Sequence, residues 1–422
     1  MINFQMKKLN ILILLILGLI SACSVTQNIS NNFMENDLNA IHPSFKIYHS
    51  NEFLSTIYYE FNSNELLYTR ESKNSLFQSK INIKYSVFEE NNKTPIDTGS
   101  VMIFDKVVDV KNEHVEGYFE IDFPFQKKGH IKLEARDENR GRSIKFFNHI
   151  DKLNDFNEQF FLLKDSSNNV LHNNYISSEN DITIVSYFNA KKSLSASHNS
   201  TYFPLARPPF SKESKTVFNY KTSSAKVLSK NSNSSFNYKL PGFGIIHFQL
   251  DTNSKNGFTL FQFHDHFPKI KTSEEMIHPI RFICTKEEFQ KIRNSSDSKQ
   301  AIDDFWLKKG NTSDISRELI KKYYSRVEKA NVYFSSHKEG WKTDRGMVSI
   351  IFGPPKLVRK SSNSIVWIYG DENNMNSITF TFERINNPFS NNDYQLTRNY
   401  NLKNPWYRAV DAWRNGKAYW IQ

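Results

Sequence analysis

Cysteine is almost absent from this chain, which contains only Cys23 and Cys284 in 422 residues. If Cys23 is modified, Cys284 has no partner, so the folded part gains no stability from disulfide bonds. Long apolar runs are equally scarce, because only Ile11–Ile20 is unbroken and no other segment approaches the length of a transmembrane helix. Nothing beyond the N-terminus is therefore expected to span a bilayer.

Signatures of catalysis are also missing. The chain has no glycine-rich phosphate fingerprint, no HExxH zinc motif and no nucleophile elbow. His264 and His266 have a spacing seen in metal sites, but the order of residues identifies no third ligand. Cys284 lies in an apolar stretch and is expected to be an unreactive thiol. We expect no catalytic residue, no bound metal and no cofactor.

The single apolar run and the residues around it have the features of a signal peptide. Lys7 and Lys8 precede Ile11–Ile20, whose helix of about 15 Å is too short for a hydrocarbon core of roughly 30 Å. Small residues then lead to Cys23, in an arrangement that resembles the lipobox of bacterial lipoproteins. We therefore expect a cleaved signal peptide over residues 1–22 and acylation, by palmitate-type chains, of Cys23. An ordinary secretory signal is the alternative.

The residues after Cys23 bear on location. Residues 23–40 are polar and without periodicity, which is typical of a flexible tether. Ser24–Asn28 contains no acidic side chain, whereas some Gram-negative lineages use an acidic cluster there to export lipoproteins to the cell surface. We expect a protein of the cell envelope, anchored by lipid to the outer membrane and facing the periplasm.

The composition is basic, with a formal net charge of +11 that becomes +9 once Lys7 and Lys8 are removed. The lysines are spread along the chain and form no dense block, and the expected compartment, the cell envelope, contains no nucleic acid. We therefore expect no nucleic-acid partner. Attraction to anionic lipid headgroups or cell-wall polymers stays open beside a surface that serves solubility alone.

Alternation with a period of two dominates the first half of the chain. From 41 to 150 it predicts an immunoglobulin-like β-sandwich, with a hairpin turn at Asp137–Gly141. From 151 to 271 it predicts a second β domain with long loops over 191–200 and 211–237. Strands of the first domain are expected at Phe53–Phe61, Lys80–Phe88, Val101–Phe104, Glu116–Phe123, His130–Ala135 and Ser143–Phe147.

The second half changes character. Residues 272–335 read as a helical segment, with a capping box at Thr285 and Glu288 and helices near 297–309 and 313–334. Residues 336–422 predict an α+β domain. Its expected parts are a three-stranded antiparallel sheet of Met347–Phe352, Ile365–Tyr369 and Ile378–Phe382, and a last helix capped by Asn404 with Pro405 in its first position.

The sequence Gly-Trp-Lys-Thr-Asp-Arg-Gly at 340–346, followed by the Ile-Phe-Gly-Pro-Pro turn, resembles the GWxTD domain. Upstream, Pro279–Ile283, Phe305–Trp306 and Tyr323–Val327 match in order, so the resemblance covers roughly 275–422. The family consists of bacterial envelope proteins, often with signal peptides and N-terminal β domains. The resemblance implies no established enzymatic activity.

Two interpretations of this motif are open. In the structural one, Trp341 packs against the sheet, and Thr343 and Asp344 bond loop N–H groups, with Asp344 also pairing with an arginine. In the functional one, exposed side chains form a contact surface for a partner. The candidate partner-binding residues are Trp341, Thr343, Asp344, Arg345 and Arg359.

Three functional hypotheses follow. The leading one is a non-catalytic envelope lipoprotein that binds another envelope protein in a membrane-associated assembly. The second is a lipoprotein that binds a glycan of the cell wall or surface. The third and weakest is a metal-dependent hydrolase built on His264 and His266.

Overall fold

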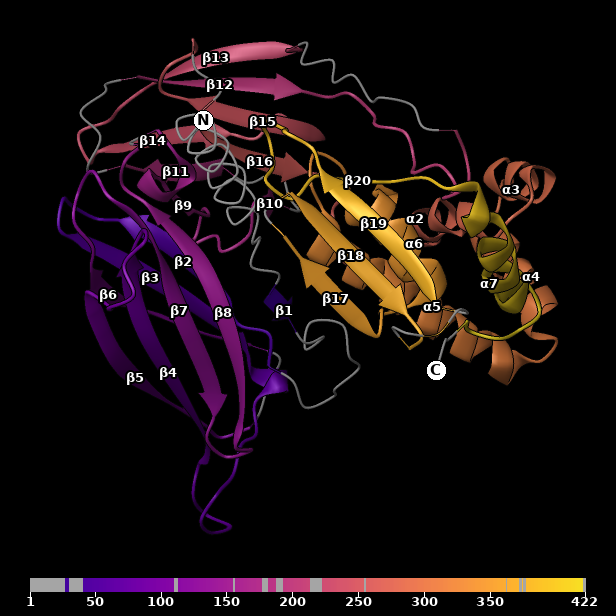
Figure 1. The fold of residues 1–422 in the computed structure, drawn as a ribbon, viewed down its shortest axis with the longest axis horizontal. Helices are drawn as coiled ribbons and strands as arrows, with labels where there is room; N and C mark the ends of the chain where they lie inside the picture. The colour runs from indigo at the N-terminus through magenta and orange to yellow at the C-terminus, as the bar shows by residue number, and fades with distance from the viewer. Residues whose placement is uncertain are drawn as a thin grey trace, which may run out of the picture.

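The computed structural model describes residues 27–29, 41–109, 113–154, 156–176, 181–186, 193–212, 222–253, 256–361, 363–371, 374 and 377–419. The predicted signal peptide and the lipidation of Cys23 lie outside these residues. Of the predicted tether, only the strand β1 (Gln27–Ile29) is described. Figure 1 shows a β-sandwich beside a second β domain and a C-terminal α+β domain. The expected mainly β architecture is confirmed.

The first domain is a sandwich of two antiparallel sheets, in the orders β2-β3-β6 and β5-β4-β7-β8. The period of two buries Ile81, Ile83 and Val87 in the core and turns the residues between them outward. All six expected strands are present, and β2 is added to them. The strands are β2 (Ser44–His49), β3 (Leu54–Asn62), β4 (Phe77–Glu89), β5 (Asp97–Val107), β6 (His114–Asp122), β7 (Lys128–Asp137) and β8 (Arg142–Asp151).

The turn predicted between β7 and β8 is confirmed, with Gly141 at a φ of 70°. A positive φ strains any residue with a Cβ, so glycine suits this position. A short 3₁₀ turn, η2 (Ser63–Glu65), lies between β3 and β4.

The second domain also consists of two sheets, in the orders β10-β16-β15-β12-β13 and β14-β11-β9. The expectation of loops over 191–200 and 211–237 is wrong where β12, β13 and β14 occur. Serine and asparagine disfavour strands, but β12 is paired on both sides and buries Leu194 and Ala196, so tertiary pairing overrides propensity. The elements are η3 (Glu158–Phe160), β9 (Leu162–Lys164), β10 (Tyr175–Ile176), β11 (Asp181–Val185), β12 (Ser193–Asn199), β13 (Ser224–Ser229), β14 (Ser235–Lys239), β15 (Gly244–Gln249) and β16 (Phe258–Gln262).

The helical segment has the expected helices, α3 (Lys286–Arg293), α4 (Ser298–Gly310) and α5 (Ser313–Phe334), after α2 (Ser273–Ile277) and η4 (Pro279–Phe282). The capping box of Thr285 and Glu288 is present at the start of α3. One hydrophobic core extends from Ile277 to Trp413. The boundary expected between residues 335 and 336 falls inside this core.

The prediction of a strand at Met347–Phe352 is wrong, because these residues form α6 (Asp344–Phe352). Every residue of α6 is buried, so the helix has no polar face and its sequence carries no helical period. The sheet beside it instead follows the order β1-β17-β18-β19-β20. Its further strands are β17 (Leu357–Lys360), β18 (Ser364–Tyr369), β19 (Ile378–Arg384) and β20 (Tyr394–Leu396).

The last helix is α7 (Lys403–Arg414), preceded by the 3₁₀ turn η6 (Tyr400–Leu402). Pro405 is its third residue and Leu402 its N-cap, so the expected capping by Asn404 is wrong. Trp406 and Trp413 pack into the domain core. None of the helices in the described part of the chain is long and apolar enough to cross a bilayer.

Candidate functional site

The glycines of the 340–346 motif hold two backbone segments in contact. A Cβ on Gly340 would overlap the carbonyl oxygen of Ala330 on α5, and one on Gly346 would overlap the carbonyl oxygen of Gly340. Gly340 begins the 3₁₀ turn η5 (Gly340–Lys342), and Gly346 lies in the first turn of α6. Both glycines are therefore required by close approach.

Thr343 and Asp344 start α6. The Thr343 hydroxyl accepts a hydrogen bond from the Gly346 N–H at 3.0 Å and donates to the Gly340 carbonyl at 2.7 Å, so Thr343 is the N-cap. Asp344 follows as the first helical residue, where a carboxylate interacts favourably with the helix dipole. The motif thus ends one turn and begins a helix.

Asp344 makes the predicted pair with an arginine, which is Arg398. Its Oδ1 lies 2.6 Å from one guanidinium nitrogen of Arg398 and its Oδ2 lies 3.2 Å from the other, and both side chains are nearly buried. Asp344 Oδ2 also accepts the Leu396 N–H at 2.8 Å. This bidentate ion pair lies in the low-dielectric interior and holds the N-terminus of α6 against the segment after β20.

Trp341 and Arg345 pack inward on either side of the pair. Trp341 is 4% exposed and its ring contacts Phe282, with ring centres 6.2 Å apart. The Arg345 guanidinium lies 4.3 Å from the centre of the Tyr394 ring and donates to the Asn392 carbonyl at 2.9 Å. Burial lowers the pKa of Arg345 to about 10. These contacts resemble those of a domain core.

Four of the five candidate contact residues therefore lie inside the domain, where Trp341, Thr343, Asp344 and Arg345 are between 4 and 8% exposed. Arg359 lies apart on β17 and is half-buried. Asp344 makes the contacts that the structural interpretation requires, whereas the aromatic ring contact of Trp341 is with the 3₁₀ turn η4 and not with a strand. A partner surface at these positions stays a prediction.

A segment from the second domain crosses to this motif. Residues 203–210, here called the strap, contain three prolines. The Ala206 N–H donates to the Lys342 carbonyl at 3.0 Å, and the Pro209 carbonyl accepts the Asn399 N–H at 3.0 Å. Leu205, Ala206 and Phe210 pack against the C-terminal core. The strap thus fastens the motif and the segment after β20 together.

Ser336, His337 and Asp393 lie together and buried near the motif, but their geometry does not match a hydrolase triad. The Ser336 Oγ at 3.2 Å and the Asp393 Oδ2 at 3.5 Å both face the same nitrogen, Nδ1, of His337. A proton relay needs the serine and the carboxylate on opposite ring nitrogens. Burial also lowers the pKa of His337 to about 3. The cluster is a buried polar network.

The histidine pair of the hydrolase hypothesis lies against Glu275, which the sequence did not identify. Oε1 of Glu275 is 3.0 Å from Nδ1 of His264 and 2.8 Å from Nδ1 of His266. Its Oε2 accepts backbone N–H groups that cap α2. Within the described ranges, no group of three or more His, Cys, Asp or Glu residues is placed to hold a metal ion.

Cys284 is equally unsuited to chemistry. Its side chain packs at the edge of the C-terminal core, and burial raises the pKa of its thiol to about 12. Because the thiolate is the reactive form of cysteine, this environment agrees with the prediction of an unreactive thiol.

A wide groove lies where the three domains meet, with a volume of about 1060 Å³. The sandwich contributes β2 and β8, the second domain contributes η3, β10 and β16, and the C-terminal domain contributes the end of α5 and the loop between β19 and β20. Amide side chains are unusually frequent in its lining. They are Asn148, Asn157, Gln159, Asn173, Asn174, Asn256, Asn386, Asn387, Asn391 and Asn392.

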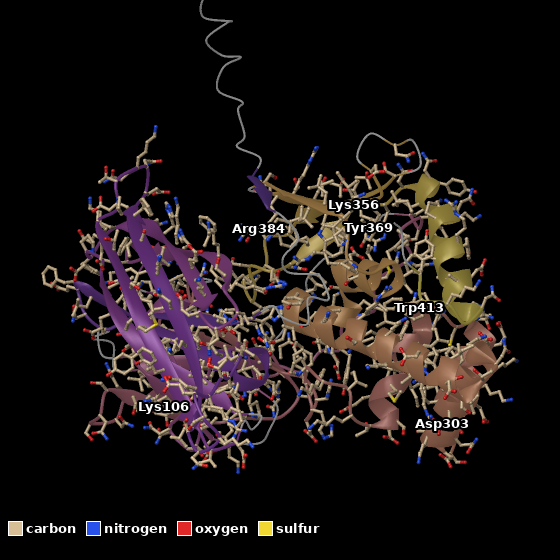
Figure 2. The ribbon with its side chains drawn as sticks, turned by 90° about the horizontal axis from the view of Figure 1, so that it is seen from below. Lys106, Asp303, Lys356, Tyr369, Arg384 and Trp413 are labelled. Atoms are coloured by element: carbon tan, nitrogen blue, oxygen red, sulfur yellow. The ribbon has the colours of Figure 1, made fainter. Side chains whose placement is uncertain are left out.

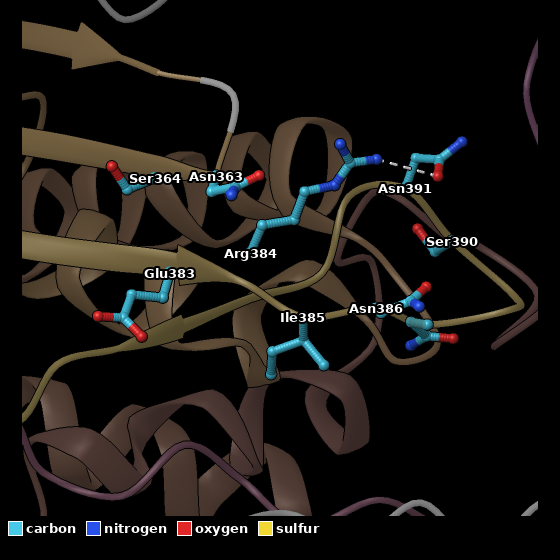
Figure 3. Close-up of a pocket in the computed structure, with 9 residues that line it drawn as sticks. Asn363, Ser364, Glu383, Arg384, Ile385, Asn386, Ser390 and Asn391 are labelled. Carbon is cyan, nitrogen blue, oxygen red and sulfur yellow. Dashed lines mark hydrogen bonds between the residues drawn. The ribbon is translucent and has the colours of Figure 1, made fainter. Parts of the chain in front are cut away.

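A second hollow of about 640 Å³ adjoins this groove. Figure 2 shows Arg384 on the side of the C-terminal domain that faces the sandwich, and Figure 3 shows it reaching across the hollow. Its guanidinium donates to Oδ1 of Asn391 at 3.1 Å. The two hollows share Asn386, Asn387, Ser390 and Asn391, so the loop over residues 385–393 borders both.

The groove was not predicted, because its lining comes from positions as distant as Phe45 and Asn392. One signal was available, since residues 386–392 read Asn-Asn-Pro-Phe-Ser-Asn-Asn. So many amides in one short loop exceed what a turn requires.

Comparison with known families matches residues 244–415 to the GWxTD domain. The match begins earlier than the expected 275, because it includes β15 and β16 of the second domain. It contains the motif and the loop over residues 385–393, whereas the strap and the sandwich lie outside it. No curated protein matches the chain.

Proposed function

We propose that this chain, which carries a GWxTD domain over residues 244–415, is a non-catalytic lipoprotein of the bacterial envelope that binds a saccharide chain in the groove between its domains. The lining of the groove is the observation that carries the proposal. Exposed amides such as Asn173 and Asn386 present a donor and an acceptor, which matches the hydroxyl groups of a sugar. Others in the lining use both amide atoms in hydrogen bonds within the protein and shape the groove instead; these are Asn157, Gln159, Asn387 and Asn392.

The character of the groove favours a saccharide over a protein partner. Protein interfaces centre on apolar pockets that receive aromatic or arginine anchors. Here amides, His149 and His172 line the groove, and rings such as Phe147 and Tyr175 offer apolar faces between them. Sugars combine polar edges with apolar C–H faces, so they suit this mixture.

The carboxylates of the groove support a binding role over hydrolysis. A glycosidase needs two carboxyl groups on opposite sides of the bond it cleaves. Asp151 and Glu158 line the groove. Oδ1 of Asp151 accepts the N–H groups of Leu153 and Asn154, and its Oδ2 lies 3.5 Å from the Lys128 amine. Asp151 is therefore held in a structural role, which leaves Glu158 without an opposing carboxylate among the described lining residues.

The groove is tested with Asn173→Ala/Asn386→Ala. Both side chains are exposed in the groove, and neither makes a hydrogen bond with another described residue. A chain of residues 24–422, which lacks Cys23 and its lipid, should sediment with insoluble cell-wall polysaccharide. The double variant should bind about tenfold more weakly, because a lost hydrogen bond weakens binding by roughly 0.5–1.5 kcal/mol. Asn401→Ala/Asn404→Ala, at exposed sites outside the groove, should bind like the wild type.

If Asn173→Ala/Asn386→Ala binds cell-wall polysaccharide as well as Asn401→Ala/Asn404→Ala does, the groove is not the binding site. The earlier hypothesis of a protein partner makes a different prediction for natively lipidated protein cross-linked in its own membranes. If one envelope protein co-purifies and the groove variant alone loses it, the groove serves protein assembly and the saccharide proposal fails.

The lipid anchor is part of the proposal, supported by the pattern of residues that ends at Cys23. Cys23→Ser should move the protein from the membrane to the soluble or secreted fraction and abolish palmitate incorporation, because the acyl chains supply the membrane affinity. Cys284→Ser provides the matched control and should leave both unchanged. Palmitate incorporation that persists in Cys23→Ser would contradict the anchor.

A further inference from the structure

One face of the sandwich carries a cluster of positive charge outside the groove. The outward side chains of the sheet β5-β4-β7-β8 include Lys80 and Lys84 on β4, Lys106 on β5, Lys132 on β7 and Lys145 on β8. All five are exposed, while the alternate residues of the same strands fill the core. Figure 2 labels Lys106 at the sandwich end of the molecule. These five residues are called the lysine face.

The charges of the lysine face are not neutralised within the described chain. No described carboxylate lies within 4 Å of any of these five amines, whereas Lys127 and Lys128 on the sandwich edge each have an acidic partner at 3.5 Å. Glu134 lies directly opposite Lys84 and Lys145 in the strand register and offsets part of their charge, whereas Lys106 and Lys132 have uncharged residues opposite them. The lysine face therefore keeps a net positive charge that an anionic partner would offset.

Exposed rings lie among the lysines. Phe104 pairs with Lys80 across the β4–β5 ladder and is 56% exposed. Phe147 pairs with Lys132 and is 57% exposed, and it lies at the edge that this face shares with the groove. The Lys132 amine lies 4.5 Å from the centre of the Phe88 ring. Surfaces that bind membranes combine cationic side chains with exposed apolar ones. The lysines attract anionic headgroups, and the aromatic rings insert at the boundary between headgroups and acyl chains.

We propose that the lysine face docks the sandwich on a bilayer that contains anionic phospholipid. A sheet face presents its charges over a broad surface, which suits a bilayer better than a single polymer strand lying in a groove. The proposal builds on the anchor at Cys23, which precedes β1 by four residues and thus by at most about 14 Å. Because β1 pairs with β17 beside the sandwich (Figure 1), the anchor would hold the sandwich near the membrane.

The test uses residues 24–422, which lack Cys23 and its lipid, so its outcome does not depend on acylation. Binding is measured by sedimentation with vesicles of phosphatidylcholine alone or with about 30% phosphatidylglycerol. The wild type should bind the anionic vesicles selectively, and binding should weaken as salt rises. Lys80→Gln/Lys84→Gln/Lys132→Gln/Lys145→Gln should bind at least about 100-fold more weakly, given the contribution of each lysine near an anionic surface.

The matched control removes four exposed lysines from helices α3 to α5, as Lys291→Gln/Lys308→Gln/Lys321→Gln/Lys322→Gln. It changes the net charge equally and should retain most of the binding. An equal loss in both variants, or equal binding to neutral vesicles, would overturn the proposal. Lysine-dependent binding to a soluble acidic polysaccharide without vesicle binding would also overturn it, in favour of an anionic polymer. Unchanged binding of the lysine-face variant to cell-wall material keeps this result separate from that of the groove.

Discussion

Replacing Asp344 with alanine should lower the free energy of unfolding of the C-terminal domain by about 3–5 kcal/mol, the range for removing one partner of a buried ion pair. The side chains of Asp344 and Arg398 are 9% and 7% exposed. Without the carboxylate, the Arg398 guanidinium stays buried with its charge uncompensated. The Leu396 N–H also loses its acceptor. Both losses come from the same side chain, which is why the expected effect is large.

Tryptophan fluorescence during urea unfolding measures this effect selectively, because all six tryptophans lie at or after Trp306. Asp371→Ala is the matched control. It breaks an ion pair with Lys356 whose side chains are 70% and 54% exposed, so it should leave the urea midpoint close to that of the wild type. A loss in Asp344→Ala as small as that in the control would show that the pair contributes little and would leave the motif free for a different role.

Gly346→Ala should destabilise the same domain by about 4 kcal/mol or more, or prevent it from folding. The new Cβ would overlap the Gly340 carbonyl oxygen, which is backbone and has no rotamer to change. Helix propensity alone predicts that this substitution would raise the free energy of unfolding, because alanine is favoured over glycine inside a helix by about 1 kcal/mol. The substitution therefore separates close packing from propensity.

The control for this substitution is Ser349→Ala in the same helix, which adds no atom and should change the free energy of unfolding by less than about 1 kcal/mol. The readout is again the urea midpoint followed by tryptophan fluorescence. A Gly346→Ala protein as stable as the wild type would mean that η5 and α6 separate easily. The motif would then be a mobile element instead of a fixed joint.

The sequence predicted elements well where one face is polar. The third helix was expected over 313–334 and is found at Ser313–Phe334, because Leu319, Tyr323 and Val327 repeat along one buried face. The prediction from sequence was wrong at α6, because every residue of this helix is buried and no polar face reveals the helical period. It also failed at β12, whose serines are held in a sheet by neighbouring strands that the local sequence does not show.

The same limit applies to the candidate site. That Asp344 would pair with an arginine followed from its residue type. The identity of Arg398 did not, because the fold brings it from 54 positions away. The groove depends on three domains and has no local signature except its asparagine-rich loop. Contacts within one turn are thus predictable, and contacts across the fold are not.

The strap also has a consequence for the order in which the protein assembles. Phe210 packs against Tyr407, with ring centres 5.4 Å apart, so the strap emerges almost 200 residues before the helix that receives it. At about 5–20 residues per second, the strap would wait roughly 10–40 seconds for its partner. Throughout that interval the α7 side of the core is not available to Phe210. A chain that emerges N-terminus first, whether from a ribosome or from a translocation pore, therefore exposes this apolar segment before α7 can cover it.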